Sequence, residues 1–270
     1  NGRLAMGRPA NISDSPGYDN QPSFAPDGKS LFFTSARGET PPGARSSQMD
    51  IYRYTVLSRQ IAAVTRTPES EYSAMTTPDG RLSVIRVEAD GTQRLWSFTV
   101  EGKDPKLLLA DIKPVGYHAW LDSNTLALFV LGQPATLQIA DVRRGTAQIA
   151  ATDIGRSLQR MPGGGVSFVQ RGGEGNKRTL TISEVRLENG KAVTRAITTA
   201  APGASDEYVA WTPDGTLLMA AAGKLYAWRP GGDWTAIADL DAAGLRSVSR
   251  LAISPLGEWL ALVAHRSPSQ

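Results

Sequence analysis

Polar and aromatic residues recur at six places along the chain, each just ahead of a turn motif. The six sets are Tyr18-Asp19-Asn20-Gln21, Glu69-Ser70-Glu71-Tyr72, Tyr117-His118, Arg156-Ser157-Leu158-Gln159-Arg160, Asp206-Glu207-Tyr208 and Arg246 to Arg250. Carboxylates, guanidinium groups, phenols and an imidazole bind ligands by charge, hydrogen bonding and ring contact. The candidate ligand- or partner-binding residues are Asn20, Gln21, Glu71, Tyr72, Tyr117, His118, Arg156, Arg160, Glu207 and Tyr208.

The metal chemistry open to these residues is that of oxygen ligands. The chain has no cysteine and only two histidines, His118 and His265, whereas an ordinary zinc site takes three or four ligands. Asp19, Glu71 or Glu207 with backbone carbonyls would suit Ca²⁺ or Mg²⁺, but no EF-hand spacing accompanies them. We therefore expect no cofactor, and we keep a calcium or magnesium ion at these carboxylates as an alternative.

Motifs for covalent or phosphate chemistry are missing from the sequence. No Gly-x-Ser-x-Gly elbow occurs, so a serine hydrolase site is not indicated. Glu71 and Glu207 could supply a carboxylate pair for glycoside cleavage, but their separation in space does not follow from the sequence. The glycine runs at 163–165 and 172–175 lack a following Lys-Ser/Thr and read as hairpin loops. We assign no catalytic residue.

Composition and charge limit the classes of partner that the sequence predicts. The 270 residues carry a net charge of +3 with no block of five basic residues, so we expect no nucleic-acid binding. No apolar run approaches the ~20 residues that span a bilayer, and we expect no transmembrane segment. The numbering begins at Asn1 rather than Met; we expect that a signal peptide has been removed and that the protein is periplasmic or secreted.

The elements that position these residues form a repeat. Pro-Asp-Gly occurs at 26–28, 78–80 and 213–215, and weaker copies centre on Leu121, Pro162 and Pro255. Proline presets the turn, aspartate accepts backbone hydrogen bonds and glycine supplies positive φ. A period of about 40–50 residues with four strand-like runs in a unit is typical of a β-propeller.

The first unit resembles a known family. Its Gln21-Pro22-Ser23-Phe24-Ala25-Pro26-Asp27-Gly28-Lys29, the following Phe-Phe-Thr-Ser and the later Asp50-Ile51-Tyr52 are similar to the WD-like repeat of TolB-like propellers. The resemblance extends over residues 3 to 265. It implies a six-bladed β-propeller in the periplasm that acts by binding partners, and it names no partner.

We therefore predict an all-β fold, a single six-bladed β-propeller domain of four-stranded antiparallel blades over residues 1–270. The blades are expected near 19–66, 71–110, 115–152, 156–198, 206–239, and 247–265 together with 1–14. Residues 3–6 and 8–13 would supply the last two strands and close the ring, which protects the sheet edges. Phe24, Trp120 and Trp211 would pack between blades.

In such a ring the first strand of each blade lines a central channel, and the six polar sets meet at its mouth. We expect a non-enzymatic binding or scaffolding propeller of the bacterial envelope, a monomer that recognises a protein, peptide or small ligand there. One alternative is a divalent-metal-dependent hydrolase of carbohydrates or lactones that uses channel carboxylates. Another is a sensor domain of a larger envelope protein.

Overall fold

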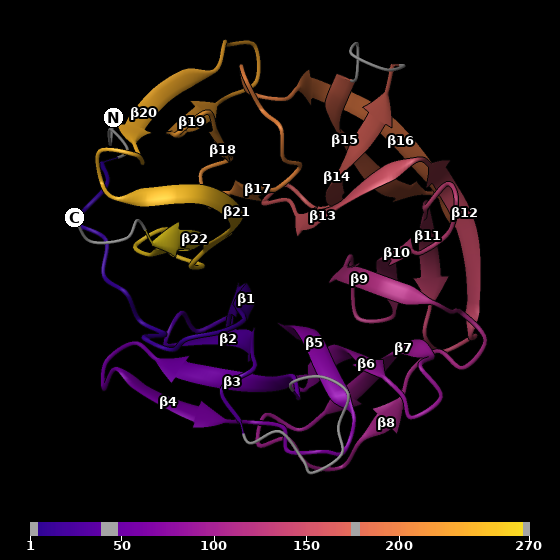
Figure 1. Cartoon of the computed structure of the whole chain (residues 1–270). Coiled ribbons are helices and arrows are strands. Elements are labelled where there is room, and N and C mark those ends of the chain that lie inside the picture. Colours follow the sequence, from indigo (N-terminus) through magenta and orange to yellow (C-terminus); the bar gives the residue numbers. More distant parts are fainter. Residues whose placement is uncertain (1–4, 39–47, 174–178, 267–270) are drawn as a thin grey trace.

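The computed structural model describes residues 5–38, 48–173 and 179–266, and they form a ring of six antiparallel sheets. Five sheets have four strands and the sixth has two, and each is an up-and-down meander in chain order. Figure 1 shows the first strand of each sheet nearest the centre of the ring. No helix occurs in the part of the chain that is described.

The strand bounds follow the turn chemistry of the repeat. The first two blades are β1 (Asp19–Phe24), β2 (Ser30–Ser35), β3 (Asp50–Thr55), β4 (Gln60–Ala63), and β5 (Ser70–Thr76), β6 (Leu82–Val87), β7 (Gln93–Phe98), β8 (Lys106–Leu107). The next two are β9 (Val115–Trp120), β10 (Thr125–Val130), β11 (Thr136–Asp141), β12 (Thr146–Thr152), and β13 (Ile154–Arg160), β14 (Val166–Gly172), β15 (Thr179–Glu188), β16 (Lys191–Thr199). The last are β17 (Val209–Trp211), β18 (Leu217–Ala221), β19 (Lys224–Trp228), β20 (Thr235–Asp239), and β21 (Leu245–Ile253), β22 (Leu260–Arg266).

The prediction of six complete blades is wrong. Five blades have four strands, and the sixth sheet contains only β21 and β22. Residues 5–18 precede β1 and form no strand, while residues 1–4 of the predicted closing strands lie outside the described residues. The local chemistry explains the difference. Asn11 Oδ1 accepts the backbone N–H groups of Ser13 and Asp14 at 3.2 Å each, and such a turn competes with strand pairing.

The N-terminal segment nevertheless lies against the sixth sheet. Met6 packs on the apolar cluster that joins that sheet to the fifth blade, beside Leu251 and Leu225. Strand β21 contacts both β1 and β17, so the ring is closed by side-chain packing of the two-stranded sheet between its neighbours.

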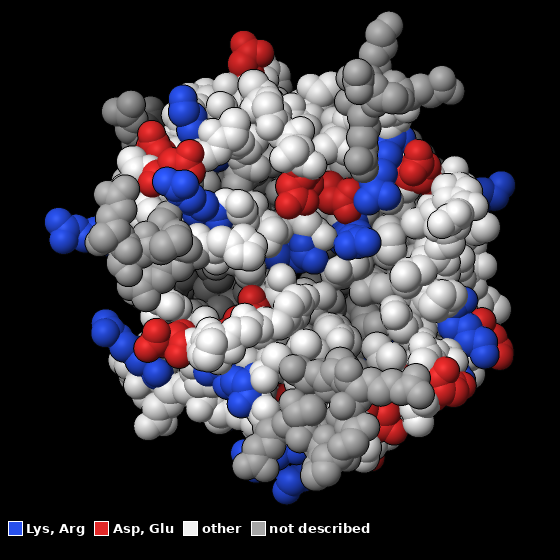
Figure 2. Space-filling model, viewed as in Figure 1, with Lys and Arg blue, Asp and Glu red and all other residues white. Residues whose placement is uncertain are grey.

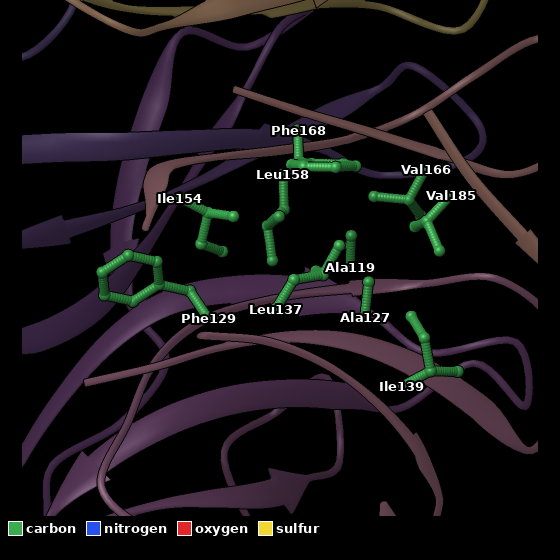
Figure 3. Close-up of a cluster of buried hydrophobic side chains, with 10 residues drawn as sticks. All are labelled: Ala119, Ala127, Phe129, Leu137, Ile139, Ile154, Leu158, Val166, Phe168 and Val185. Atoms are coloured by element: carbon green, nitrogen blue, oxygen red, sulfur yellow. The ribbon is translucent and has the colours of Figure 1, made fainter. Parts of the chain in front are cut away.

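The core lies between the blades. In the cluster of Figure 3, Leu137 and Ile139 of β11 meet Ile154 and Leu158 of β13 and Phe168 of β14. Burial of each such side chain stabilises the fold by about 1.5–3 kcal/mol. Because a single blade has two apolar faces and no interior of its own, the ring of contacts is what makes the blades stable.

A tryptophan–serine hydrogen bond recurs at two of the blade interfaces. Trp120 Nε1–H donates to Ser83 Oγ of the preceding blade at 2.9 Å, and Trp211 Nε1–H donates to Ser167 Oγ at 2.8 Å. Each serine hydroxyl also lies within hydrogen-bond distance of a carbonyl of its own first strand. The inter-blade role predicted for Trp120 and Trp211 is confirmed.

Candidate functional site

The first strands of the blades bring the polar sets to one end of the channel. Since each four-stranded blade is a meander, the chain returns to the same end of the ring before every new first strand. Three of these strands carry a bulge with a left-handed residue, Gln21 (φ 57°), Ser73 (φ 53°) and Ser247 (φ 49°). Bulges re-aim the side chains beside them, here those at the start of β1 and β5 and in the middle of β21.

Arg250 of β21 reaches across the channel. Its Nη2 donates to Tyr117 Oη of β9 at 3.1 Å, and β21 and β9 lie on opposite sides of the ring (Figure 1). The Arg250 guanidinium carbon lies 3.4 Å from the ring centroid of Tyr208 and 5.6 Å from that of Tyr117. Cation–π contact of this kind stabilises a partly buried arginine.

Two further tyrosines belong to this group. Burial raises the pKa of Tyr18 to about 12; the neighbouring phenols of Tyr117 and Tyr72 add to the rise, and the charge of Arg250 opposes it. Tyr18 is therefore within electrostatic range of Tyr117, Tyr72 and two arginines, Arg250 and Arg156. We call Tyr18, Tyr72, Tyr117, Tyr208 and Arg250 the channel-mouth cluster. Its phenol groups can donate or accept hydrogen bonds.

The charge of Arg250 has no carboxylate partner in ion-pair contact among the described residues. Burial lowers the pKa of Arg250, and the nearby charge of Asp206 opposes that shift without forming an ion pair. The other hydrogen-bond acceptor that Arg250 contacts is the Ser249 carbonyl, at 3.1 Å. A cation held in this way keeps the capacity to bind an anion.

Glu207, in contrast, is fully engaged between the fourth and fifth blades. Arg171 binds it with both Nε and Nη2, at 3.0 and 2.7 Å from Oε2, and the Arg156 backbone N–H donates to Oε1 at 2.6 Å. A Cβ at Gly155 would lie 2.6 Å from Oε2, so glycine is what allows this approach. Glu207 is buried and ties two blades together.

Glu71 is buried at the corresponding place in the second blade, with fewer partners. Its Oε1 accepts the Thr67 hydroxyl and lies 3.2 Å from Arg86 Nε, while Oε2 has no hydrogen-bond partner among the described residues. Burial raises the pKa of Glu71 to about 7, against the opposing hydrogen bonds of Thr67 and Thr65 and the charge of Arg86. Arg86 is shared with Glu69, at 2.6 Å.

His118 is directed into the protein rather than toward the channel mouth. Its Nε2 lies 2.7 Å from Ser83 Oγ, and burial lowers its pKa to about 3, so the ring is neutral. This Ser–His pair is no nucleophile–base couple: Ser83 is fully buried and also accepts the Trp120 N–H. His118 Nδ1 has no orienting partner in the described part of the chain, although a catalytic dyad needs one.

The remaining predicted residues are spread out. Gln21 Oε1 accepts the Thr34 hydroxyl at 2.9 Å and the Ser73 backbone N–H at 3.0 Å, which links the first two blades. Asn20 accepts the N–H of Gln21. Arg156 is exposed at the start of β13, and Arg160 is exposed at the other end of that strand. Asp19, considered as a metal ligand, pairs with Arg37 at 3.0 Å.

The structure therefore brings Tyr117 and Tyr208 together around Arg250, and the candidate set omitted both Arg250 and the nearby Tyr18. Both stand in the polar sets of the sequence. The bulge at Ser247 sets which residue of 246–250 faces the channel, and sequence spacing alone does not reveal it. Figure 2 shows the centre of this face hollowed, with acidic and basic side chains beside the hollow.

Solved structures share this arrangement. A putative TolB from Agrobacterium tumefaciens superposes with a TM-score of 0.69 at 15% identity, covering 96% of this chain and 93% of its own. The chain is a β-propeller. A gluconolactonase from Xanthomonas campestris (TM-score 0.70, 9% identity, 94% of this chain and 85% of its own) and an oligogalacturonate lyase from Vibrio parahaemolyticus (0.63, 10%, 94% and 76%) have similar folds.

At these identities the likeness concerns the propeller fold alone. No protein-family model matches the sequence, and no curated protein matches it. Within the described residues, no helix has the length and apolar character needed to cross a membrane. The function of this propeller must therefore be argued from its own side chains.

Proposed function

We propose that this propeller is a non-enzymatic binding module that receives a peptide, a protein segment or a small ligand at the channel-mouth cluster. The observation that carries the proposal is the contact of Arg250 with Tyr117 and Tyr208, so that three different blades supply side chains to one place. Tyrosine and arginine are enriched where proteins bind partners, since they offer large contact area and hydrogen bonds together.

The state of the carboxylates favours binding over hydrolysis. Asp19, Glu71 and Glu207 are the carboxylates that the metal-dependent alternative would use, and each is held by an arginine or a hydroxyl. In the described residues no group of three histidine, aspartate or glutamate side chains is placed to hold a metal ion. An envelope location, expected from the TolB-like repeat, is part of the proposal.

The test is a selection of ligands on the purified protein. A displayed peptide library and a glycan array would be screened against the wild type, Tyr208→Leu and Leu57→Ala, a control at an exposed side chain. We expect ligands that lose about ten-fold or more in affinity with Tyr208→Leu and bind Leu57→Ala normally. Ligands indifferent to every mouth variant would contradict the proposal, as would cation-dependent turnover of a lactone or glycoside that is abolished by Glu71→Gln.

A further inference from the structure

The channel-mouth cluster contains one cation, Arg250, that forms no ion pair with the described carboxylates. Every other partly buried arginine discussed above lies against a carboxylate: Arg37 with Asp19, Arg86 with Glu69, and Arg171 with Glu207. Arg250 instead contacts a phenol, two aromatic rings and a carbonyl. A buried charge without a counter-ion is unfavourable, so the position of Arg250 calls for an explanation outside the fold.

The groups around Arg250 define what could neutralise it. The guanidinium carbon lies over the Tyr208 ring, 3.4 Å from its centroid, and the N–H groups of the guanidinium are the donors available to a ligand. The Tyr117 hydroxyl stands beside Nη2 and can turn its own hydrogen toward a bound oxygen. A planar acceptor of two oxygens matches this fork better than a single atom does.

The local charge indicates how much negative charge the bound anion carries. Arg250 and the exposed Arg156 both act on Tyr18, and Asp206 lies in the vicinity of Arg250. These three charges sum to +1, which balances one carboxylate, whereas a phosphate dianion would need a larger excess of cations. The surrounding tyrosine rings favour a ligand with an apolar or ring-shaped body next to that charge.

Resting on the proposed function, we infer that the channel mouth recognises a carboxylate-bearing ligand, with Arg250 as its anchor and Tyr117 as a second donor. Entry of the carboxylate replaces the Arg250–Tyr117 contact that spans the channel. Two sources share this chemistry: the free C-terminus of a peptide and an acidic sugar.

The experiment compares matched pairs that differ only in charge. N-acetyl-glycyl-tyrosine would be measured against its C-terminal amide and D-glucuronate against D-glucose, by calorimetry, with inorganic phosphate as a further probe. Any peptide or glycan from the selection above would be tested in the same way, as acid and as amide. We expect the acid of one pair to bind about ten-fold more tightly than its neutral partner, the loss of about 1.4 kcal/mol marking one ionic hydrogen bond.

Two variants separate recognition from structure. Arg250→Met should bring the affinities of acid and amide within two-fold of each other, and Arg250→Lys should keep part of the preference. Without ligand, Arg250→Met should melt at or above the wild-type temperature, because it removes an uncompensated cation. If Arg250 only holds opposite blades together, Arg250→Met should lower the melting temperature and leave the preference for the acid over the amide unchanged. That result would overturn the inference.

The remaining outcomes also decide between the two proposals. Ligands that depend on Tyr208 but bind equally as acid and amide would overturn the carboxylate assignment and leave the binding function standing. Stronger binding of phosphate than of any carboxylate would overturn it as well. If neither the selection nor any pair yields binding sensitive to Tyr208, both proposals fail.

Discussion

Glu71 and Glu207 occupy corresponding places in the second and fifth blades, each directly before a tyrosine of the channel-mouth cluster and ahead of a Pro-Asp-Gly turn. Both are buried. Glu207 receives two donors from Arg171 and one backbone N–H, whereas Glu71 shares Arg86 with Glu69 and leaves Oε2 without a partner.

The difference teaches that the cost of a buried carboxylate depends on the donors that can reach it. At the fifth blade, the missing side chain of Gly155 lets β13 approach Glu207 closely enough for a backbone N–H to donate. At the second blade no comparable donor is delivered to Oε2, and the proton itself becomes the stabilising partner. The stability contributed at Glu71 should therefore depend on pH.

The largest expected effect is at Glu207, the carboxylate with the full set of hydrogen-bond donors. Glu207→Gln removes a bidentate ion pair and leaves Arg171 uncompensated, so we expect a loss of about 2–4 kcal/mol in the free energy of unfolding, lower than for a fully buried pair because Arg171 is partly exposed. Urea denaturation measures it. Glu188→Gln, in an exposed pair with Arg195, is the control and should cost less than about 1 kcal/mol. Equal losses in the two variants would show that the buried ion pair between blades stabilises the fold no more than the exposed pair does.

The second effect tests the role of Gly155. Gly155→Ala places a methyl group where the Glu207 carboxylate lies, and we expect a loss of about 2 kcal/mol through the displaced hydrogen bonds. In a Glu207→Ala background the same change should cost less than about 0.5 kcal/mol, since the atoms in conflict are gone. A double-mutant cycle in urea measures the coupling. Additive losses would show that glycine serves another purpose.

Glu71→Gln should increase the free energy of unfolding at pH 8, whereas Glu207→Gln decreases it. The folded pKa of about 7 lies above the ordinary value of 4.5, so the folded protein holds the proton more tightly. The resulting stability is fully present below pH 4.5 and is lost as the pH rises through 7. Because Arg86 and Thr67 lose a charged acceptor, we expect a net gain of about 1–2 kcal/mol at pH 8, not the whole shift.

The measurement is a urea series from pH 4.5 to 8 on the wild type and Glu71→Gln. Burial also raises the pKa of Asp50, which adds a slope of the same sign, so the variant should be flatter than the wild type without becoming level. Arg86 and Arg66 are the cations near these groups. Parallel curves for the two proteins would show that Glu71 does not titrate in this range.

The smallest expected effect is a shift in the midpoint of the fall in stability with pH, the pH at which half of the contribution of Glu71 is lost. The charge of Asp50 contributes to the raised pKa of Glu71, so Asp50→Asn should move the midpoint of the stability fall to lower pH by less than about one unit. Asp111→Asn, at an exposed loop position, is the control and should leave the midpoint in place. A shift to higher pH would reverse the assigned interaction.

Much of the fold could be predicted from short-range chemistry. Asp27 Oδ1 accepts the Lys29 N–H at 2.9 Å and Gly28 has a φ of 68°, as a Pro-Asp-Gly turn requires. The Asp50-Ile51-Tyr52 motif of the repeat lies in strand β3, Asp50–Thr55. The predicted closing strands failed because Asn11 forms a turn with its own neighbours, a local preference that the alternation of apolar residues did not reveal.

The candidate site was less predictable. Tyr72, Tyr117 and Tyr208 could be chosen because they precede turns, but the contact between Tyr117 and Arg250 joins residues 133 positions apart. Glu71, Glu207 and His118 stand in the same sequence sets as the tyrosines and yet point into blade interfaces. Neighbouring residues on a strand face opposite sides, and a bulge of one residue exchanges those sides.

The amino-acid sequence by itself determined the propeller, its turns, and the polar residue sets ahead of them, because these depend on residues within one turn or one strand of each other. Only the tertiary structure decided how many blades have four strands, which carboxylate is fully paired, and that Arg250 reaches Tyr117 across the channel. The physical reason is that burial and ion pairing depend on which side chains arrive from other blades, and this is set by the closure of the whole ring.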